Sequence, residues 1–471
     1  MPMIVWDIET SGVSKHHDIP LQAAFIVCSD DLVVQREIVL RGRLPQHVIP
    51  SPDALLITRT TPEMIDSAPL SQLEFVQAIA QVVSSAGPAC WCAYNGLKFD
   101  ELILRSAFFQ TLHPVYATQA PGSTRADVMV MAQAIAAQEP WALNVPLNEV
   151  GKPTFKLGAL CAANGIILPA ENEHDALGDA RATLALLRHL RQAAPVTFGM
   201  LMSNADRRHV LDLLRHNEVL ALTQHYGAAK TLPVAPIVVS PVNRNAYAVA
   251  DLTVDPSAYL LKNEVELAEL LAIRGPRAIF TVATNVQPML FEFGHGGAVI
   301  VDPLPVGEFR ARARRIRDDH GFVARLTAVL GRQFSDRAPS AEPEEQIYDN
   351  FIAKPDQAHS RRWHEIAWDQ RHRFAQAVID DPRLKVFARR MVFEAAPETM
   401  PPVERAAMRA WLIDRLLTDI DRPWMTIPAA RRRLAELAAA CDPSDVGRVQ
   451  HIADIVDWFD AKTVTLNAMS D

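Results

Sequence analysis

The chain has 471 residues, of which 49% are hydrophobic and 22% are charged, a composition typical of a globular protein with two or three domains. No apolar run approaches the ~20 residues of a membrane-spanning helix, and the first residues lack a signal-peptide pattern, so we expect a cytoplasmic protein without membrane contact. The net charge of −8 argues against general electrostatic attraction to nucleic acid and restricts such binding to a local basic surface.

The segment 3–12 combines an apolar run with two carboxylates and is predicted to be a buried strand. Alternate side chains of a strand share a face, so Val5, Asp7 and Glu9 point to one side of the sheet. Neighbouring carboxylates repel each other unless a cation lies between them, and a divalent ion with oxygen ligands is the usual one. The alternative is a strand that runs into a polar turn with both carboxylates solvated, and the pair alone does not separate the two interpretations.

The following segments predict the rest of a mixed sheet and its helices. Asp30-Asp31 joins two apolar runs as a hairpin would, Thr61 is placed to cap a helix, and Asn95-Gly96 turns the chain sharply after a strand. The predicted strands are 21–29, 32–40 and 89–94, and the predicted helices begin at Pro62 or cover 70–83, 126–138 and 156–163.

Two further acidic clusters lie at predicted helix starts. Asp100 follows the 89–94 strand and its turn, and Asp179 lies four residues after Asp175, so these two share a helix face. His174 is about 140° around a helix from Asp179 and therefore belongs to the preceding loop. The alternatives are acids that complement a helix dipole and a solvent-exposed histidine.

The order of these clusters resembles the DEDDh family of 3′ to 5′ exonucleases. The resemblance implies an α/β, RNase H-like fold in which Asp7, Glu9, Asp100 and Asp179 hold two Mg²⁺ ions, for which Mn²⁺ can substitute, and His174 is the general base. Hard ions prefer carboxylate oxygens, and two of them clamp the attacking and leaving oxygens of a phosphodiester. A histidine with an ordinary pKa near 6.5 accepts a proton from the attacking water at neutral pH.

A closer resemblance, to the bacterial exonuclease I family, covers nearly the whole chain. It is carried by LLITRTTP (55–62), YNGLKFD (94–100), FKL (155–157), NGI (164–166), HDA (174–176), NRNA (243–246) and QIYDNF (346–351). It implies an exonuclease domain at 1–194, an SH3-like β domain at 195–343 and an α-helical C-terminal domain at 344–471. It further implies substrate contacts by Glu9, Thr10, Asn95, Phe99, Arg105 and Lys156.

The activity that this resemblance implies is processive 3′ to 5′ degradation of single-stranded DNA to 5′-mononucleotides, in DNA repair, recombination and mismatch correction. The implied partners are single-stranded DNA and the single-stranded DNA-binding protein, and the chain is expected to be a monomer. Two alternatives stay open at this point. One is an RNA-trimming exonuclease of the same superfamily, and the other is a catalytically silent protein that binds single strands.

The sequence departs from the exonuclease I pattern at four positions. Arg59 replaces the usual glycine after Ile-Thr, Ile8 and Ser11 replace Tyr and Phe in the first acidic motif, and Lys156 replaces an arginine that contacts substrate. A lysine holds phosphate as a point charge, whereas an arginine holds it as a fork. The four acids and His174 are all present.

The second half offers two candidate DNA-binding surfaces, each with a structural alternative. A basic run is either a wall of the DNA channel or a solvated helix face; it comprises Arg310, Arg312, Arg314, Arg315 and Arg317. Aromatic residues beside arginines after residue 344 either stack on single strands or form a helical core; they are Trp363, Trp368, Phe374, Phe387 and Phe393. The five scattered cysteines are expected to be reduced.

Overall fold

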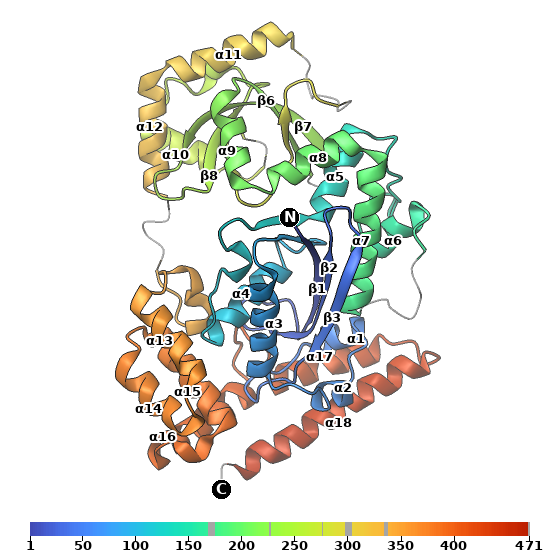
Figure 1. Ribbon diagram of the computed structural model, residues 1–471, viewed down its shortest axis with the longest axis vertical. Coiled ribbons are helices and arrows are strands. Elements are labelled where there is room, and N and C mark those ends of the chain that lie inside the picture. Colours follow the sequence, from blue (N-terminus) through green and yellow to red (C-terminus); the bar gives the residue numbers. More distant parts are fainter. Residues whose placement is uncertain (168–174, 226–227, 276, 297–303, 334–337, 470–471) are drawn as a thin grey trace.

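The computed structural model describes residues 1–167, 175–225, 228–275, 277–296, 304–333 and 338–469. Figure 1 shows a sheet in the middle of the molecule, a second sheet above it, and the helices of the C-terminal third below and to the left. The predicted α/β fold with a mixed sheet followed by a helical C-terminal part is confirmed.

The central sheet has the strand order β3-β2-β1-β4-β5. Its strands are β1 (Met3–Thr10), β2 (Pro20–Cys28), β3 (Val34–Arg41), β4 (Cys90–Ala93) and β5 (Thr124–Asp127). β2 pairs antiparallel with β1 and β3, as the predicted hairpin requires, whereas β4 lies parallel to β1 and β5. The predicted alternation along β1 is confirmed, because Val5 lies in the core on one face while Trp6 and Ile8 lie in the core on the other.

Helices cover both faces of this sheet. They are α1 (Pro52–Ile57), α2 (Pro62–Asp66), α3 (Gln72–Ala86), α4 (Asp100–Gln110), η1 (Ala117–Gln119), α5 (Val128–Gln138), α6 (Leu157–Ala163), α7 (Ala176–Ala193) and α8 (Pro195–Asn204). α7 packs across β1 and β2, on the face of Val5, while α3 and α4 pack on the face of Trp6. Several boundaries differ from prediction by one to three residues. One of them has a clear cause: the helix expected from residue 126 begins at Val128, because Ala126 and Asp127 pair with β4.

The second sheet is antiparallel, with the order β10-β6-β7-β8-β9. Its strands are β6 (Leu220–His225), β7 (Ala229–Val239), β8 (Ala246–Asp251), β9 (Ile279–Ala283) and β10 (Leu290–Glu292), and its helices are α9 (Arg207–His216), η3 (Pro256–Ala258), α10 (Glu264–Ala272), α11 (Val306–Asp318) and α12 (His320–Gly331). The SH3-like assignment stays a prediction. The expected domain boundary at 194/195 falls between α7 and α8, and α8 packs against α5 and α7 of the first part.

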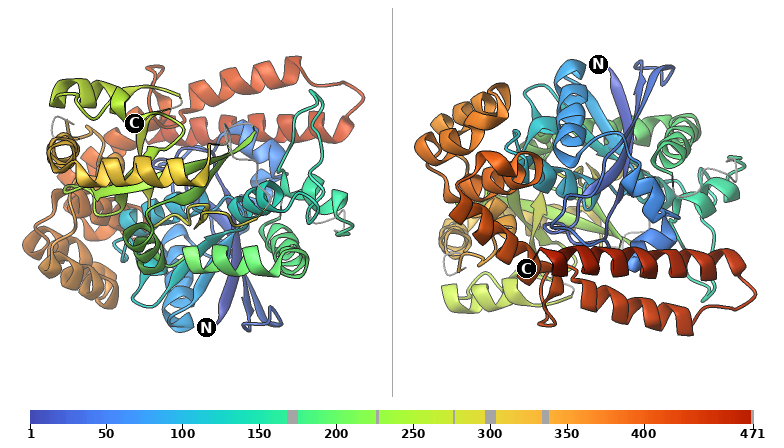
Figure 2. Two further views of the ribbon diagram at one scale, coloured as in Figure 1. Left: turned by 90° about the horizontal axis from the view of Figure 1, so that it is seen from above. Right: turned by 90° about the horizontal axis from the view of Figure 1, so that it is seen from below.

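The C-terminal part is helical and shares a hydrophobic core with the first part. Its elements are η4 (Pro343–Tyr348), α13 (Lys354–Glu365), α14 (Trp368–Val378), α15 (Pro382–Ala395), η5 (Pro397–Thr399), α16 (Pro402–Leu417), α17 (Ile427–Ala439) and α18 (Val446–Ala468). The shared core joins Leu55, Ile65 and Phe109 to Phe387 and Phe459. Figure 2 shows α17 and α18 side by side across the underside of the molecule.

A buried ionic cluster lies at the same junction. A carboxylate oxygen of Glu344 accepts hydrogen bonds from Arg390 at 2.7 Å and from Arg415 at 3.0 Å, and all three residues are buried. Arg415 also donates to the carbonyl of His47 in the first part. None of the helices in the described ranges combines the length and the apolar character that crossing a membrane requires.

Candidate active site

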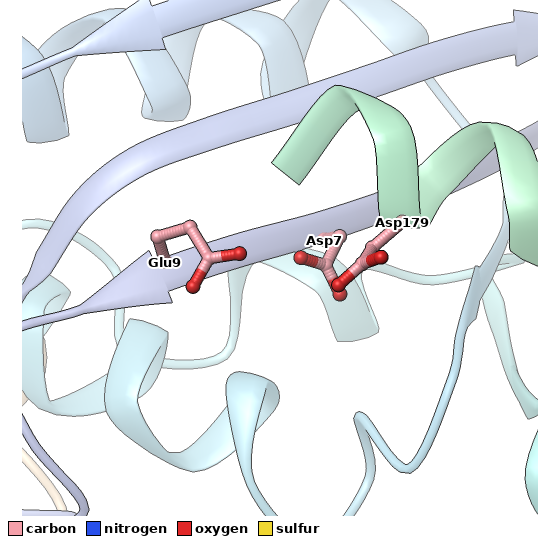
Figure 3. Close-up of side chains that lie close together, drawn as sticks. All are labelled: Asp7, Glu9 and Asp179. Carbon is pink, nitrogen blue, oxygen red and sulfur yellow. The ribbon is translucent and has the colours of Figure 1, made fainter. Parts of the chain in front are cut away.

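Three of the predicted carboxylates meet at one edge of the central sheet. Asp7 and Glu9 project from the same face of β1, and Asp179 lies in the first turn of α7, which packs on that strand. Each residue offers one carboxylate oxygen, and these three atoms all lie within 4.8 Å of one another. Figure 3 shows the carboxyl groups of Asp7 and Asp179 facing each other, with Glu9 further along the strand. The fold thus assembles a compact set of oxygen ligands from two distant segments.

Asp100 adds a fourth carboxylate to the acidic cluster, from the start of α4 just after the turn that follows β4. It is the first residue of α4 and only 5% exposed. The turn approaches closely because Asn95 adopts a left-handed φ of 58° and because Gly96 has no side chain: a Cβ there would lie 2.4 Å from the Cβ of Ala93 and 3.2 Å from a carboxylate oxygen of Asp100. The local backbone therefore requires the Asn-Gly pair.

Asp127 holds this turn and is a functional residue that the sequence interpretation missed. Its carboxylate accepts hydrogen bonds from the backbone N–H of Asn95 at 2.9 Å and of Leu97 at 3.4 Å, and it also caps α5 through the N–H of Met129. An acid at the end of a strand that precedes a helix was the available signal. Asp127 thereby positions the backbone that presents Asp100.

The electrostatics of the cluster call for a cation. Burial, together with the charges of the neighbouring carboxylates, raises the pKa of Asp7 well above its usual range and raises the pKa of Glu9 to about 9. Burial and the charges of Asp127 and Glu101 raise the pKa of Asp100 to about 8. Like charges in a buried site cannot all ionise without compensation. A set of carboxylate oxygens without nitrogen or sulfur fits a hard divalent ion.

His174 and Asp175, which precede Asp179 in the sequence, are not part of the set of three carboxylates. His174 lies outside the described residues. Asp175 precedes α7 and does not join the ligand set formed by the three carboxylates; its carboxylate accepts hydrogen bonds from the side chains of Gln22 and Arg41. These contacts fix the start of α7 against β2 and β3, and so fix the position of Asp179.

The predicted substrate contacts fall into two groups. Lys156 is exposed at the start of α6, and Asn95 and Phe99 are half-buried on the turn that leads to Asp100. Thr10 is buried and donates a hydrogen bond to the carbonyl of Gly12. Arg105 has only 12% of its side chain exposed and forms an ion pair with Glu101 at 3.0 Å, so its guanidinium is largely committed to the protein.

The structure bears on both candidate DNA-binding surfaces of the second half, for which the alternatives were a solvated helix face and a hydrophobic core. Three basic side chains of α11 pair with acids: Arg312 with Glu308, Arg315 with Asp255, and Arg317 with Glu218. These pairs favour the interpretation of a solvated helix face. Trp363, Phe387 and Phe393 are buried, so the interpretation as core is correct for them. The four cysteines in the first part are free and buried, as expected.

Comparisons with known proteins agree with this architecture. Residues 341–462 match the family model of the exonuclease I C-terminal domain. In sequence, the chain is 28% identical to exodeoxyribonuclease I of Haemophilus influenzae over 270 residues, 56% of each protein. It is 29% identical to exodeoxyribonuclease I of Escherichia coli over 368 residues, 75% of this chain and 77% of the relative. The first alignment therefore spans about half the length of the curated relative that it matches.

Solved structures match over nearly the full length. Exonuclease I from Methylocaldum szegediense superposes with a TM-score of 0.84 at 25% identity, covering 98% of this chain and 99% of that one. E. coli exonuclease I in complex with a dA16 oligonucleotide superposes with a TM-score of 0.83 at 21% identity and the same coverage.

The chain is thus similar to bacterial exonuclease I in its C-terminal domain, over three quarters of its sequence and in its whole fold.

Proposed function

We propose that the chain is a metal-dependent 3′ to 5′ exonuclease that degrades single-stranded DNA and releases nucleoside 5′-monophosphates. The observation that carries the proposal is the convergence of Asp7, Glu9 and Asp179 within 4.8 Å, with the buried Asp100 acting on the pKa of Asp7 and Glu9. Mutually repelling carboxylates that are ionised together destabilise a fold, and a bound cation offsets this cost. The relatedness to exodeoxyribonuclease I supports the choice of DNA.

The acids are assigned roles as ligands of two Mg²⁺ ions, for which Mn²⁺ can substitute. Asp7, Glu9 and Asp179 would hold one ion, and Asp7 together with Asp100 would hold the other. When bound, such ions neutralise charge on the phosphate and activate a water. His174 would be the general base that accepts a proton from the attacking water, while Lys156 and the turn at Asn95 and Phe99 would hold the terminal nucleotide.

Further elements of the proposal rest on the family resemblance. They are a cytoplasmic location, a monomeric state, processive action in DNA repair, recombination and mismatch correction, and contact with single-stranded DNA-binding protein. The presence of Asp7, Glu9, Asp100 and Asp179 in one cluster argues against a catalytically silent binding protein, because such a protein does not need the carboxylates together.

The test is degradation of single-stranded DNA, duplex DNA and RNA of matched sequence, each labelled at its 5′ end. With Mg²⁺ we expect the single-stranded DNA to shorten from its 3′ end with mononucleotide products, and EDTA to stop the reaction. Asp7→Asn should abolish hydrolysis while binding of single-stranded DNA persists. Asp419→Asn is the control, since Asp419 is 83% exposed and pairs with the surface residue Arg432. Faster degradation of RNA than of single-stranded DNA would show that RNA is the substrate. Unchanged turnover by Asp7→Asn would refute the assignment of the acidic cluster as the active site.

A further inference from the structure

The loop between β9 and β10 of the second part contacts the first part at strand β5. We call residues 284–289 the β9–β10 loop. The side-chain Oε1 of Gln287 accepts a hydrogen bond from the backbone N–H of Asp127 at 2.6 Å. The carbonyl of Asn285 accepts a hydrogen bond from the guanidinium of Arg125 at 2.8 Å. The loop is therefore bonded to two residues of the strand that precedes α5.

Gln287 has a backbone conformation that does not suit a residue with a side chain. Its φ is +51°, in the left-handed region that favours glycine. The residue is nevertheless buried, and its Nε2 donates a hydrogen bond to the carbonyl of Leu201 in α8 at 2.9 Å. Such strain persists only where the surrounding structure imposes it, and it is typical of functional positions. Because a glycine would relieve the strain, the position makes use of the side-chain amide.

The amide of Gln287 satisfies a backbone group at the edge of the central sheet. β5 is the last strand in the order of the described strands, and Asp127 at its end is completely buried. A buried backbone N–H without a partner is costly, so Gln287 fixes the backbone of Asp127. The carboxylate of Asp127 in turn accepts hydrogen bonds from the N–H groups of Asn95 and Leu97. These two residues belong to the turn that presents Asp100.

A second series of hydrogen bonds connects the β9–β10 loop to the residue that follows Asp100. One terminal nitrogen of Arg125 donates to the carbonyl of Asn285, and the other donates to a carboxylate oxygen of Glu101 at 3.3 Å. Glu101 lies in the first turn of α4 and is only 1% exposed. The β9–β10 loop therefore supports the start of α4 through two separate residues of β5.

The alternative is that these hydrogen bonds only join the two parts of the chain. Other contacts already serve that purpose. Asn204 of α8 donates to two carbonyls of the segment that follows Gln287, and Gln138 of α5 donates to Thr223 of β6 at 2.9 Å. Gln138 is the last residue of α5, whereas Asp127 caps its start, about 16 Å away at 1.5 Å per residue. Gln138 thus offers a buried glutamine of the same chemistry at a distance from the acids.

We propose that Gln287 is a positioning residue for Asp100, so that the second part of the chain takes part in assembling the acidic cluster. The inference rests on the proposed function and extends it beyond the residues of the first part. Gln287 holds the backbone of Asp127, and the carboxylate of Asp127 holds the turn before Asp100. Partners behind a metal ligand set its orientation and its affinity for the ion. Loss of the Gln287 amide should therefore affect the site supported by Asp100 more than the site formed by the other three acids.

Amide hydrogen exchange in the metal-free protein tests the positioning without any measurement of activity. In Gln287→Met, which keeps the side-chain size but loses the amide, the turn 94–99 should exchange roughly 2- to 12-fold faster, the equivalent of one net hydrogen bond. Gln287→Gly removes the amide while its backbone suits a positive φ, so it should show the same increase in a stably folded protein. Gln138→Met is the control and should exchange in this turn like the wild type. Wild-type exchange of the turn in both Gln287 variants would overturn the proposal.

Calorimetry with Mn²⁺ and steady-state kinetics test the consequence for the metal site. In Gln287→Met we expect one Mn²⁺ to bind as in the wild type and the second to bind roughly 10-fold more weakly. At limiting Mg²⁺, kcat on single-stranded DNA should fall while KM for the DNA stays unchanged, and excess Mg²⁺ should restore part of the rate. An equal loss of Mn²⁺ affinity in Gln138→Met would show that the amide only joins the two parts and would overturn the proposal. A wild-type protein that neither binds Mn²⁺ nor degrades DNA would refute the proposed function instead.

Discussion

Asp7 on β1 and Asp179 in the first turn of α7 bring carboxylate oxygens within 4.8 Å of each other, although they lie at opposite ends of the first part of the chain. The packing of α7 across β1 and β2 creates this proximity, and Gln22 and Arg41 fix the start of α7 through Asp175. A half-buried pair of acids this close together is unfavourable by itself. The fold therefore accepts a local cost at this edge, which a bound cation would offset.

The first prediction concerns pH and metal. The pKa of Glu9 is raised from 4.5 to about 9, and that of Asp100 to about 8. Between about pH 4.5 and pH 9 the metal-free folded state therefore binds more protons than the unfolded chain. Its stability should then fall as pH rises from about 4.5 to about 9. Mg²⁺ binds the ionised groups, so the increase in Tm on adding Mg²⁺ should grow with pH in thermal scans. An Mg²⁺ effect equal at pH 5 and pH 8 would contradict this.

The second prediction concerns the general base. His174→Ala should lower the rate of hydrolysis by about 10²- to 10⁴-fold, the usual contribution of a positioned base. Affinity for Mn²⁺, measured by calorimetry, should stay close to that of the wild type. If Mn²⁺ affinity fell in proportion to the rate, His174 would be a ligand rather than a base. His189→Ala, toward the C-terminal end of α7, serves as the control substitution.

The third prediction concerns the position at which the exonuclease I pattern has glycine. Arg59 is exposed and has a φ of +53°, a left-handed conformation that costs a non-glycine residue about 1 to 2 kcal/mol. Arg59→Gly removes this strain but increases the entropy of the unfolded chain, so we expect a net gain of about 0.5 to 1 kcal/mol in urea unfolding. Arg36→Gly, at an exposed site in β3, should destabilise instead. Loss of stability in Arg59→Gly would contradict the strain argument.

The fourth prediction concerns the ionic cluster beneath the central sheet. Burial alone would raise the pKa of Glu344, but the charges of Arg390 and Arg415 lower it to about 2. Glu344→Gln leaves two buried guanidinium groups without a counter-charge, so we expect a loss of about 3 to 5 kcal/mol in unfolding free energy. Glu365→Gln, which breaks the exposed pair with Arg362, should cost at most about 1 kcal/mol. Similar losses in the two variants would show that Glu344 contributes no more than a surface pair.

The sequence predicts β1 to β4 of the central sheet because their patterns are local, whereas β5 was not predicted and the meeting of Asp7 and Glu9 with Asp179 was expected only from the family resemblance. The alternation along β1 identifies the face of Asp7 and Glu9, and the Asn95-Gly96 turn identifies the start of α4 at Asp100. The helix boundary at Val128 differs by two residues because Ala126 and Asp127 pair with β4, a tertiary contact that overrides helical propensity.

Features that depend on partners distant in sequence were not predictable. The basic run of α11 becomes largely a set of surface ion pairs only because Asp255 and Glu218 lie beside it. The exposure of Phe351 and the burial of Trp363 follow from how the C-terminal helices dock on the first part. The contact of Glu344 with Arg390 and Arg415 likewise has no local signature.

The most direct test of the central claim is anomalous scattering from crystals soaked in Mn²⁺. The account predicts anomalous density between the carboxylates of Asp7, Glu9 and Asp179, a second peak on the side of Asp100, and loss of both peaks in Asp7→Asn. Anomalous density elsewhere, with none at these carboxylates at millimolar Mn²⁺, would contradict the assignment of a metal-dependent nuclease.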